Sequence, residues 1–120
     1  MNAAEKLVDW AQLADLMGDV SDLTQRPMLA GMWQDMVSDL ERELGALAGL
    51  ATDDEARAAL HRLRGVVSMW GLRVVADRMQ AIERATSPLE TWRSQRAEIV
   101  AMAELSRLEI VKRQSWLGET

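Results

Sequence analysis

Apolar residues along the chain recur at spacings of three and four positions, which is the period of an amphipathic α-helix. Five segments carry this pattern, and they begin near Leu7, Pro27, Thr52, Leu72 and Ser87. No segment alternates apolar and polar residues in the way of a half-buried strand. The pattern therefore predicts an all-α fold.

The first predicted helix is short and runs from about Leu7 to Met17, with Gly18 as its stop signal. The second begins near Pro27, because proline suits the first turn of a helix, and it frays at Gly49. The apolar stripe that we expect this second helix to bury consists of Leu29, Trp33, Met36, Leu40, Leu44 and Leu47.

The third predicted helix follows the stretch TDDE, in which Thr52 is placed to cap the helix and Glu55 to close a capping box. It runs to about Trp70, directly before Gly71. A fourth helix follows over about residues 72–85. The side chains that we expect this fourth helix to bury are Leu72, Val75, Met79 and Ile82.

The fifth predicted helix repeats the start signal in the stretch SPLE. Ser87 is expected to cap, Pro88 to take the first helical position and Glu90 to complete a second box. The helix should extend to about Trp116. Four such helices joined by short turns predict an antiparallel up-down four-helix bundle, with the short first helix covering one end. We expect one domain over residues 1–120, with its core over about residues 7–103.

Composition narrows the possible functions. The chain has no cysteine, which excludes disulfides, thiol catalysis and cysteine zinc sites. It has one histidine, so a metal enzyme or a hydrolase built on several histidines is not expected. The net charge of -5 argues against nucleic acid, which rewards a basic face. No run approaches the ~18 to 20 apolar residues of a membrane span and none resembles a signal peptide, so we expect a soluble, cytoplasmic protein.

The single histidine, His61, is expected on the exposed face of the third helix. With a step of ~100° per residue, Leu63 and Trp70 fall on the far side of that helix from His61. Gly65 lies one turn further on the same face as His61, although a glycine inside a helix costs about 1 kcal/mol relative to alanine. Its missing side chain leaves open space beside the ring, and Arg64 supplies a permanent positive charge.

These three features suit a transiently phosphorylated nucleophile. A neutral ring nitrogen attacks, the gap admits the phosphoryl donor, and the cation stabilises the phosphate. From the residues alone, a solvated surface histidine without a role remains the alternative.

The stretch HRLRGVVSMWG resembles the signature of histidine-containing phosphotransfer (HPt) domains of two-component phosphorelays. That signature has an apolar residue two positions after the histidine, Lys or Arg three after it, and glycines four and ten after it. These places are occupied by His61, Leu63, Arg64, Gly65 and Gly71. The next stretch, LRVVADRMQAIE, resembles the following helix of the family, which ends in an apolar-acid pair. The resemblance covers about residues 7–103 and implies a four-helix bundle with a short N-terminal cap.

The resemblance also implies a function. His61, through Nε2, would accept a phosphoryl group from an aspartyl phosphate of a receiver domain and pass it to the aspartate of another receiver. Arg64 would stabilise the phosphate, and Gly65 would leave access to the ring. The chain would be a phosphoryl-transfer intermediate with no cofactor and no kinase or ATPase activity of its own, and the receiver would bring the magnesium.

The implied partners are response-regulator receiver domains or a hybrid sensor histidine kinase, bound by a monomer of this chain. We expect the docking surface to surround His61, with the second helix contributing the edge that faces the third. The residues expected on this surface are Arg57, Ala58, Arg62 and Ser68, together with Val37 and Glu41.

Some positions depart from the family pattern. Arg64 stands where lysine is commoner, and Val66 and Met69 stand where small or polar residues are commoner, which affects local packing or the choice of partner. The alternative function is a helical adaptor that kept the fold without the chemistry, although the retained His61 argues against it. Met1 and the short tail after the last helix favour a free-standing protein over a domain of a hybrid kinase.

Overall fold

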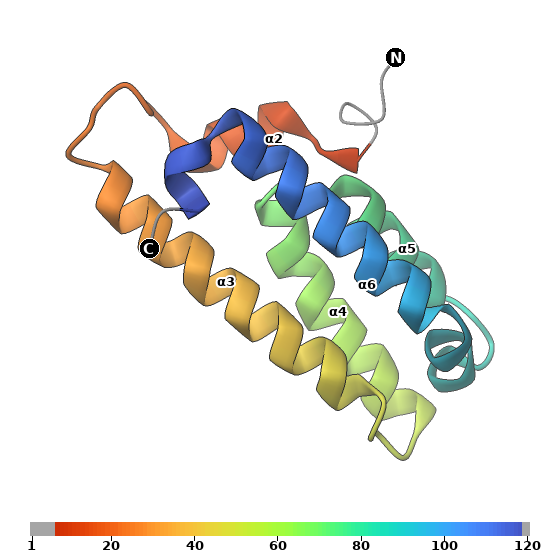
Figure 1. The fold of residues 1–120 in the computed structure, drawn as a ribbon. Coiled ribbons are helices and arrows are strands. Elements are labelled where there is room, and N and C mark those ends of the chain that lie inside the picture. The colour runs from red at the N-terminus through yellow and green to blue at the C-terminus, as the bar shows by residue number, and fades with distance from the viewer. Residues whose placement is uncertain (1–6, 119–120) are drawn as a thin grey trace.

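The computed structural model describes residues 7–118, and it confirms the all-α prediction. No β-strand occurs within that range, and no helix of it is long and apolar enough to cross a membrane. The helices are α2 (Trp10–Met17), α3 (Arg26–Leu47), α4 (Asp53–Met69), α5 (Arg73–Glu83) and α6 (Pro88–Arg113), followed by the 3-10 helix η1 (Ser115–Gly118) (Figure 1).

The long helices reverse direction one after another along the chain (Figure 1). Helix α4 packs against α5, α5 packs against α6, and α4 also contacts α3 and α6. The helix η1 contacts both α3 and α6. Helix α2 lies over the end at which α4 stops, since the Asp9 N–H donates to the Gly71 carbonyl over 2.8 Å.

One core unites these helices. Every member of the apolar stripe expected for the second helix, which is α3, is buried. The four side chains expected to be buried by the fourth helix are buried as well. Between α3 and α4, the rings of Trp33 and Trp70 meet edge to face, with their centroids 5.5 Å apart. The stripe prediction is therefore confirmed. A helix that packs on one core buries a single periodic stripe of apolar residues.

The helix starts agree only in part with the sequence signals. Thr52 caps α4 as predicted, accepting from the Glu55 N–H over 3.1 Å. Ser87 occupies the N-cap position of α6 as predicted, but its side chain makes no cap hydrogen bond with the described residues. A carboxylate oxygen of Asp53, in the first turn of α4, instead accepts from the Leu89 N–H over 3.0 Å. A carboxylate from a neighbouring helix thus satisfies a free N–H at the start of α6.

The last helix also ends earlier than the predicted end near Trp116. Helix α6 stops at Arg113, since Gln114 leaves helical geometry with φ -124° and ψ 68°. Trp116 lies in η1, where its indole N–H donates to the Gln114 side chain and the Arg26 guanidinium lies 5.2 Å from the ring centroid. Leu117 is fully buried. The helix η1 therefore covers one end of the contact between α3 and α6.

The second glycine of the HPt-like motif has a structural role. Gly71 has φ 76°, in the left-handed region that favours glycine. A Cβ at this position would lie 2.7 Å from the backbone oxygen of Asp9. Gly71 is thus required both by the turn between α4 and α5 and by the close approach of the segment before α2.

Candidate functional site

His61 projects from the middle of α4 into solvent. Its side chain is 67% exposed, whereas Leu60 and Leu63 on either side are buried. The Thr52 cap and three acidic residues in the first turn fix this helix at its start. The prediction that the imidazole lies opposite the core is confirmed.

A carboxylate from the next helix holds the imidazole. Oxygen Oε1 of Glu83, the last residue of α5, lies 2.7 Å from Nδ1 of His61, and the Glu83 side chain is only 16% exposed. An ionised carboxylate can only accept hydrogen bonds, so Nδ1 donates to Glu83 in the tautomer that carries its proton on Nδ1. The lone pair of neutral His61 is then on Nε2, which has no hydrogen-bond partner in residues 7–118.

Arg64 completes a small network around this carboxylate. Its Nε donates to Oε2 of Glu83 over 3.1 Å, and its Nη2 lies 3.0 Å from Nδ1 of His61. The ring nitrogen cannot donate to Glu83 and accept from Arg64 at once, so the two contacts belong to different tautomers. With the Gln80 amide oriented so that its oxygen faces the guanidinium, it accepts from Nη1 over 3.2 Å. A cation is therefore fixed beside the ring.

Gly65 leaves the space that the sequence predicted. A Cβ added there would meet no described atom within 4 Å, and its φ is not positive. Neither the packing nor the backbone of this chain therefore requires a glycine at this position. Gly31 and Gly45 on α3 are equally open, so open space by itself is not diagnostic. What distinguishes Gly65 is its place one turn from His61 on the same helix.

The four predicted docking residues of α4 are all exposed. Arg57 donates through Nε to the backbone oxygen of Glu83 over 3.1 Å, and Arg62 pairs with Glu43 of α3 over 2.8 Å. Ala58 and Ser68 are exposed. The surface around His61 therefore carries several cations within a chain whose net charge is -5.

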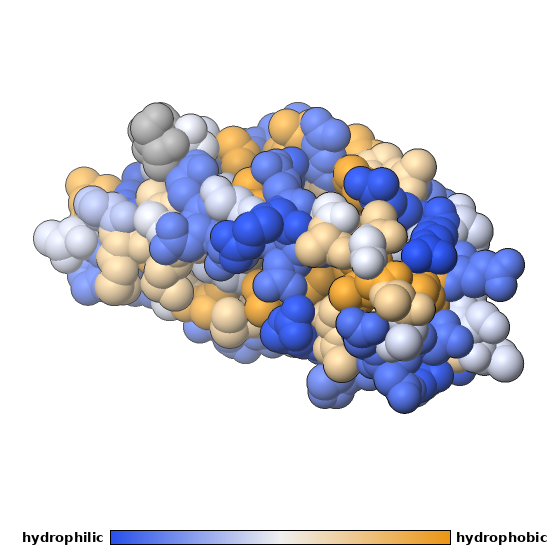
Figure 2. Space-filling model, turned by 90° about the horizontal axis from the view of Figure 1, so that it is seen from below, coloured by the Kyte–Doolittle hydropathy of each residue, from blue (hydrophilic) through white to orange (hydrophobic). Residues whose placement is uncertain are grey.

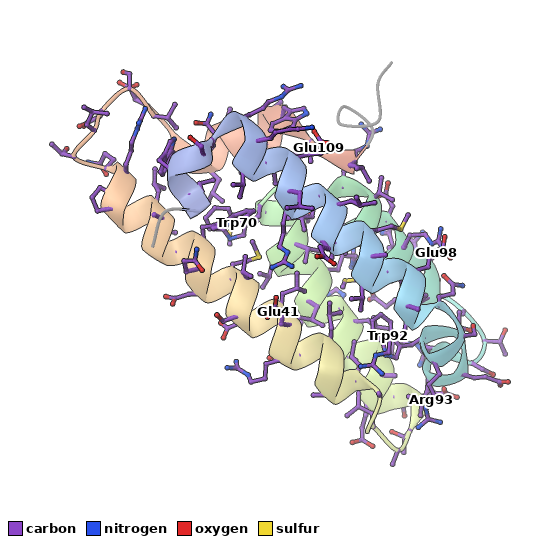
Figure 3. All side chains as sticks on the ribbon, in the orientation of Figure 1. Glu41, Trp70, Trp92, Arg93, Glu98 and Glu109 are labelled. Carbon is purple, nitrogen blue, oxygen red and sulfur yellow. The ribbon has the colours of Figure 1, made fainter. Side chains whose placement is uncertain are left out.

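Val37 and Glu41 are not part of this surface. Glu41, labelled in Figure 3, accepts from Arg107 of α6 over 3.2 Å, and Val37 lines a hollow between α3 and α6. The edge of α3 that faces α4 is instead marked by the Glu43 ion pair with Arg62. The sequence defined which side of this helix is buried, but it did not define which of the two flanking edges faces the third helix.

Glu83 is the functional residue that sequence reasoning did not identify as such. It appeared only as the acid that ends an apolar-acid pair, without a role at the histidine. A signal was available, because His61 and Glu83 lie at similar distances from Gly71 on its two sides, and helices joined by a short turn bring such positions together. No group of three or more His, Cys, Asp or Glu residues in the described range could hold a metal ion.

Comparison with models of protein families, with curated proteins and with solved structures finds no match to this chain. What the site can do must therefore be inferred from its own chemistry.

Proposed function

We propose that this protein is a histidine phosphotransfer protein of a two-component phosphorelay. It accepts a phosphoryl group on His61 from an aspartyl phosphate of a receiver domain and passes it to the aspartate of another receiver. The observation that carries this proposal is the exposed imidazole whose Nδ1 lies 2.7 Å from Glu83. With the proton on Nδ1, this contact leaves Nε2 of the exposed ring as the free nucleophile.

The chemistry needs only groups of this chain and the receiver. The lone pair of Nε2 attacks the phosphorus, the bond from phosphorus to the aspartate oxygen breaks, and the aspartate leaves as a carboxylate. The ring, now substituted at Nε2 and protonated at Nδ1, carries a positive charge. Glu83 stabilises this charge through a charge-assisted hydrogen bond. Attack by the next aspartate reverses these steps and restores the neutral ring.

Arg64 and Gly65 assist this transfer. The guanidinium is already held beside the ring by Glu83, so it can interact with the phosphate without a large rearrangement. The open space at Gly65 admits the partner's active site to within bonding distance of Nε2. The magnesium that receiver chemistry needs belongs to the partner in this scheme.

We further propose that α3 to α6 form an antiparallel up-down four-helix bundle with α2 as a cap over one end. The reversal of successive helices in Figure 1 and the packing of α4 with α5 and α5 with α6 support this topology. The protein is proposed to act as a monomer in the cytoplasm.

The test is phosphoryl transfer from a purified, phosphorylated receiver domain in the presence of magnesium. Wild-type protein should acquire phosphate that is labile in acid and stable in base. His61→Gln should acquire none, while its helicity and melting temperature stay close to those of the wild type, because the side chain is exposed. Labelling of the variant would overturn the assignment to His61. Receiver binding by the wild type without any phosphate transfer would favour the helical adaptor instead.

A further inference from the structure

Arg57 is an exposed arginine that contacts the main chain of another helix. Hydrophilic residues cover much of the face of the molecule seen from below, with apolar residues in patches between them (Figure 2). On a surface of this kind, an ion pair between two exposed side chains contributes little to stability. Arg57 instead donates through Nε to the backbone oxygen of Glu83, 26 positions away in the chain, over 3.1 Å. It therefore connects α4 to the end of α5.

Glu83 is held by two arginines of α4, one at its main chain and one at its side chain. Whereas Arg57 contacts the backbone oxygen, Nε of Arg64 donates to the carboxylate oxygen Oε2 over 3.1 Å. The other carboxylate oxygen, Oε1, lies 2.7 Å from Nδ1 of His61. Arg57, His61 and Arg64 follow one another at spacings of four and three residues, which places them on one side of α4. The side of α4 that carries the histidine thus contacts both ends of Glu83.

The place of Glu83 in α5 explains why a contact to its main chain matters. Glu83 is the last residue of α5, and Arg84 follows it as the C-cap. The last carbonyl groups of a helix have no N–H partner within the helix, and helix ends fray. A hydrogen bond to the imidazole extends only to about 3.2 Å between the heavy atoms. Fraying of the last turn of α5 would therefore take the carboxylate of Glu83 away from His61.

We propose that Arg57 is a positioning residue for phosphoryl transfer. By holding the last carbonyl of α5, it keeps the carboxylate of Glu83 at Nδ1 of His61. This inference rests on the proposed function. The ring becomes positively charged when Nε2 takes up the phosphoryl group, and Glu83 stabilises that charge only while its carboxylate is in place. Arg57 acts on this step through Glu83.

This role differs from the docking role that the sequence suggested for Arg57, and the two roles predict different kinetics. A docking residue contacts the partner protein, so its loss would slow transfer from a receiver but not from a small phosphoryl donor. A positioning residue acts on the imidazole, so its loss slows transfer from both donors. It also changes the ring in the absence of any donor.

The experiment applies two measurements to Arg57→Ala. Nitrogen-15 NMR should show a smaller fraction of neutral His61 with its proton on Nδ1 than in the wild type. Labelling of His61 should slow by about fivefold, both with a phosphorylated receiver and with phosphoramidate, which is too small to need docking.

Arg93→Ala is the matched control. Arg93 of α6, labelled in Figure 3, donates through Nη2 to the backbone oxygen of Leu50 over 3.1 Å, and this contact does not involve the histidine. The variant therefore loses a hydrogen bond of the same kind and length as Arg57→Ala does. It should keep the wild-type tautomer and the wild-type rate with both donors.

A double variant tests whether Arg57 acts through Glu83. In a Glu83→Ala background there is no carboxylate to position, so the further change Arg57→Ala should not slow labelling again. If Arg57→Ala fails to fold, Arg57→Met removes the donor but keeps an aliphatic side chain, and the same results are expected of it.

The positioning role would be overturned by an unchanged tautomer in Arg57→Ala, or by an equal change in Arg93→Ala. A loss confined to the receiver, or one that persists in the Glu83→Ala background, would overturn it as well. A wild-type protein that neither donor labels would remove the proposed function. The NMR comparison would still decide whether Arg57 keeps Glu83 at the ring, because it needs no phosphoryl donor.

Discussion

Oxygen Oε1 of Glu83 lies 2.7 Å from Nδ1 of His61, although the two residues are 22 positions apart in the chain. The contact crosses from the last residue of α5 to the middle of α4, and the turn at Gly71 makes it possible. In the tautomer with the proton on Nδ1, this contact leaves the lone pair of the ring on Nε2. The same carboxylate holds Arg64, so one acid organises both the nucleophile and its neighbouring cation.

Removing the carboxylate should slow transfer and change the tautomer. Glu83→Ala is expected to lower the rate of phosphoryl acceptance by about 10- to 100-fold, because a hydrogen bond to a charged group contributes about 1.5 to 3 kcal/mol. Nitrogen-15 NMR of His61 should show a smaller fraction with the proton on Nδ1. Glu98→Ala is the matched control. Glu98 forms an ion pair of 2.8 Å with Arg78, and this pair does not involve the histidine. An unchanged tautomer in Glu83→Ala would refute the positioning role.

Gly65 should separate stability from activity. Gly65→Ala is expected to stabilise the fold by about 1 kcal/mol, because the position is helical and open. Gly65→Gln should fold normally but slow transfer from a receiver by at least about tenfold, since its side chain occupies the space through which the partner enters. Thermal unfolding and transfer kinetics measure the two effects. Gly45→Gln, at an equally open position on α3, should fold and transfer phosphate as the wild type does.

Arg64 should contribute to transfer without being essential. Arg64→Ala removes a cation beside the phosphate and is expected to slow transfer by about tenfold, while labelling of His61 persists. Arg64→Lys should lie between the alanine variant and the wild type. The guanidinium contacts Glu83 and the ring through different nitrogens, and a single ammonium group cannot replace both contacts. Faster transfer by Arg64→Ala than by Arg64→Lys would show that the cation has another role.

The cap at the start of α6 gives a prediction about stability alone. Asp53→Ala should lower the free energy of unfolding by about 1 kcal/mol, because the Leu89 N–H loses its acceptor. Asp54→Ala removes a carboxylate from the same turn of α4 but not that bond, so it should cost less. Ser87→Ala should change the stability by less than about 0.5 kcal/mol. Chemical denaturation measures all three, and a larger loss in Ser87→Ala than in Asp53→Ala would contradict the assignment.

Much of the secondary structure of this protein can be predicted from short-range patterns in its sequence. The spacing of apolar residues is enough to predict five helices and the buried side of α3, because a helix that packs on a core must bury a periodic stripe. His61 and Gly65 share one helix, so their exposure and their common side follow from the angle per residue. The Thr52 cap follows in the same way, since donor and acceptor are three residues apart.

Contacts between helices could not be predicted from these short-range patterns. The expected place of Val37 and Glu41 beside the third helix depended on how neighbouring helices are rotated. The expected side-chain cap by Ser87 depended on which helix ends meet. In the folded chain Glu41 pairs with Arg107 of α6, and Asp53 of α4 caps α6. The bond from Glu83 to His61 belongs to the same class. Periodicity describes each helix about its own axis, whereas these contacts depend on the relative rotation and translation of two helices, which only the packing of their side chains fixes.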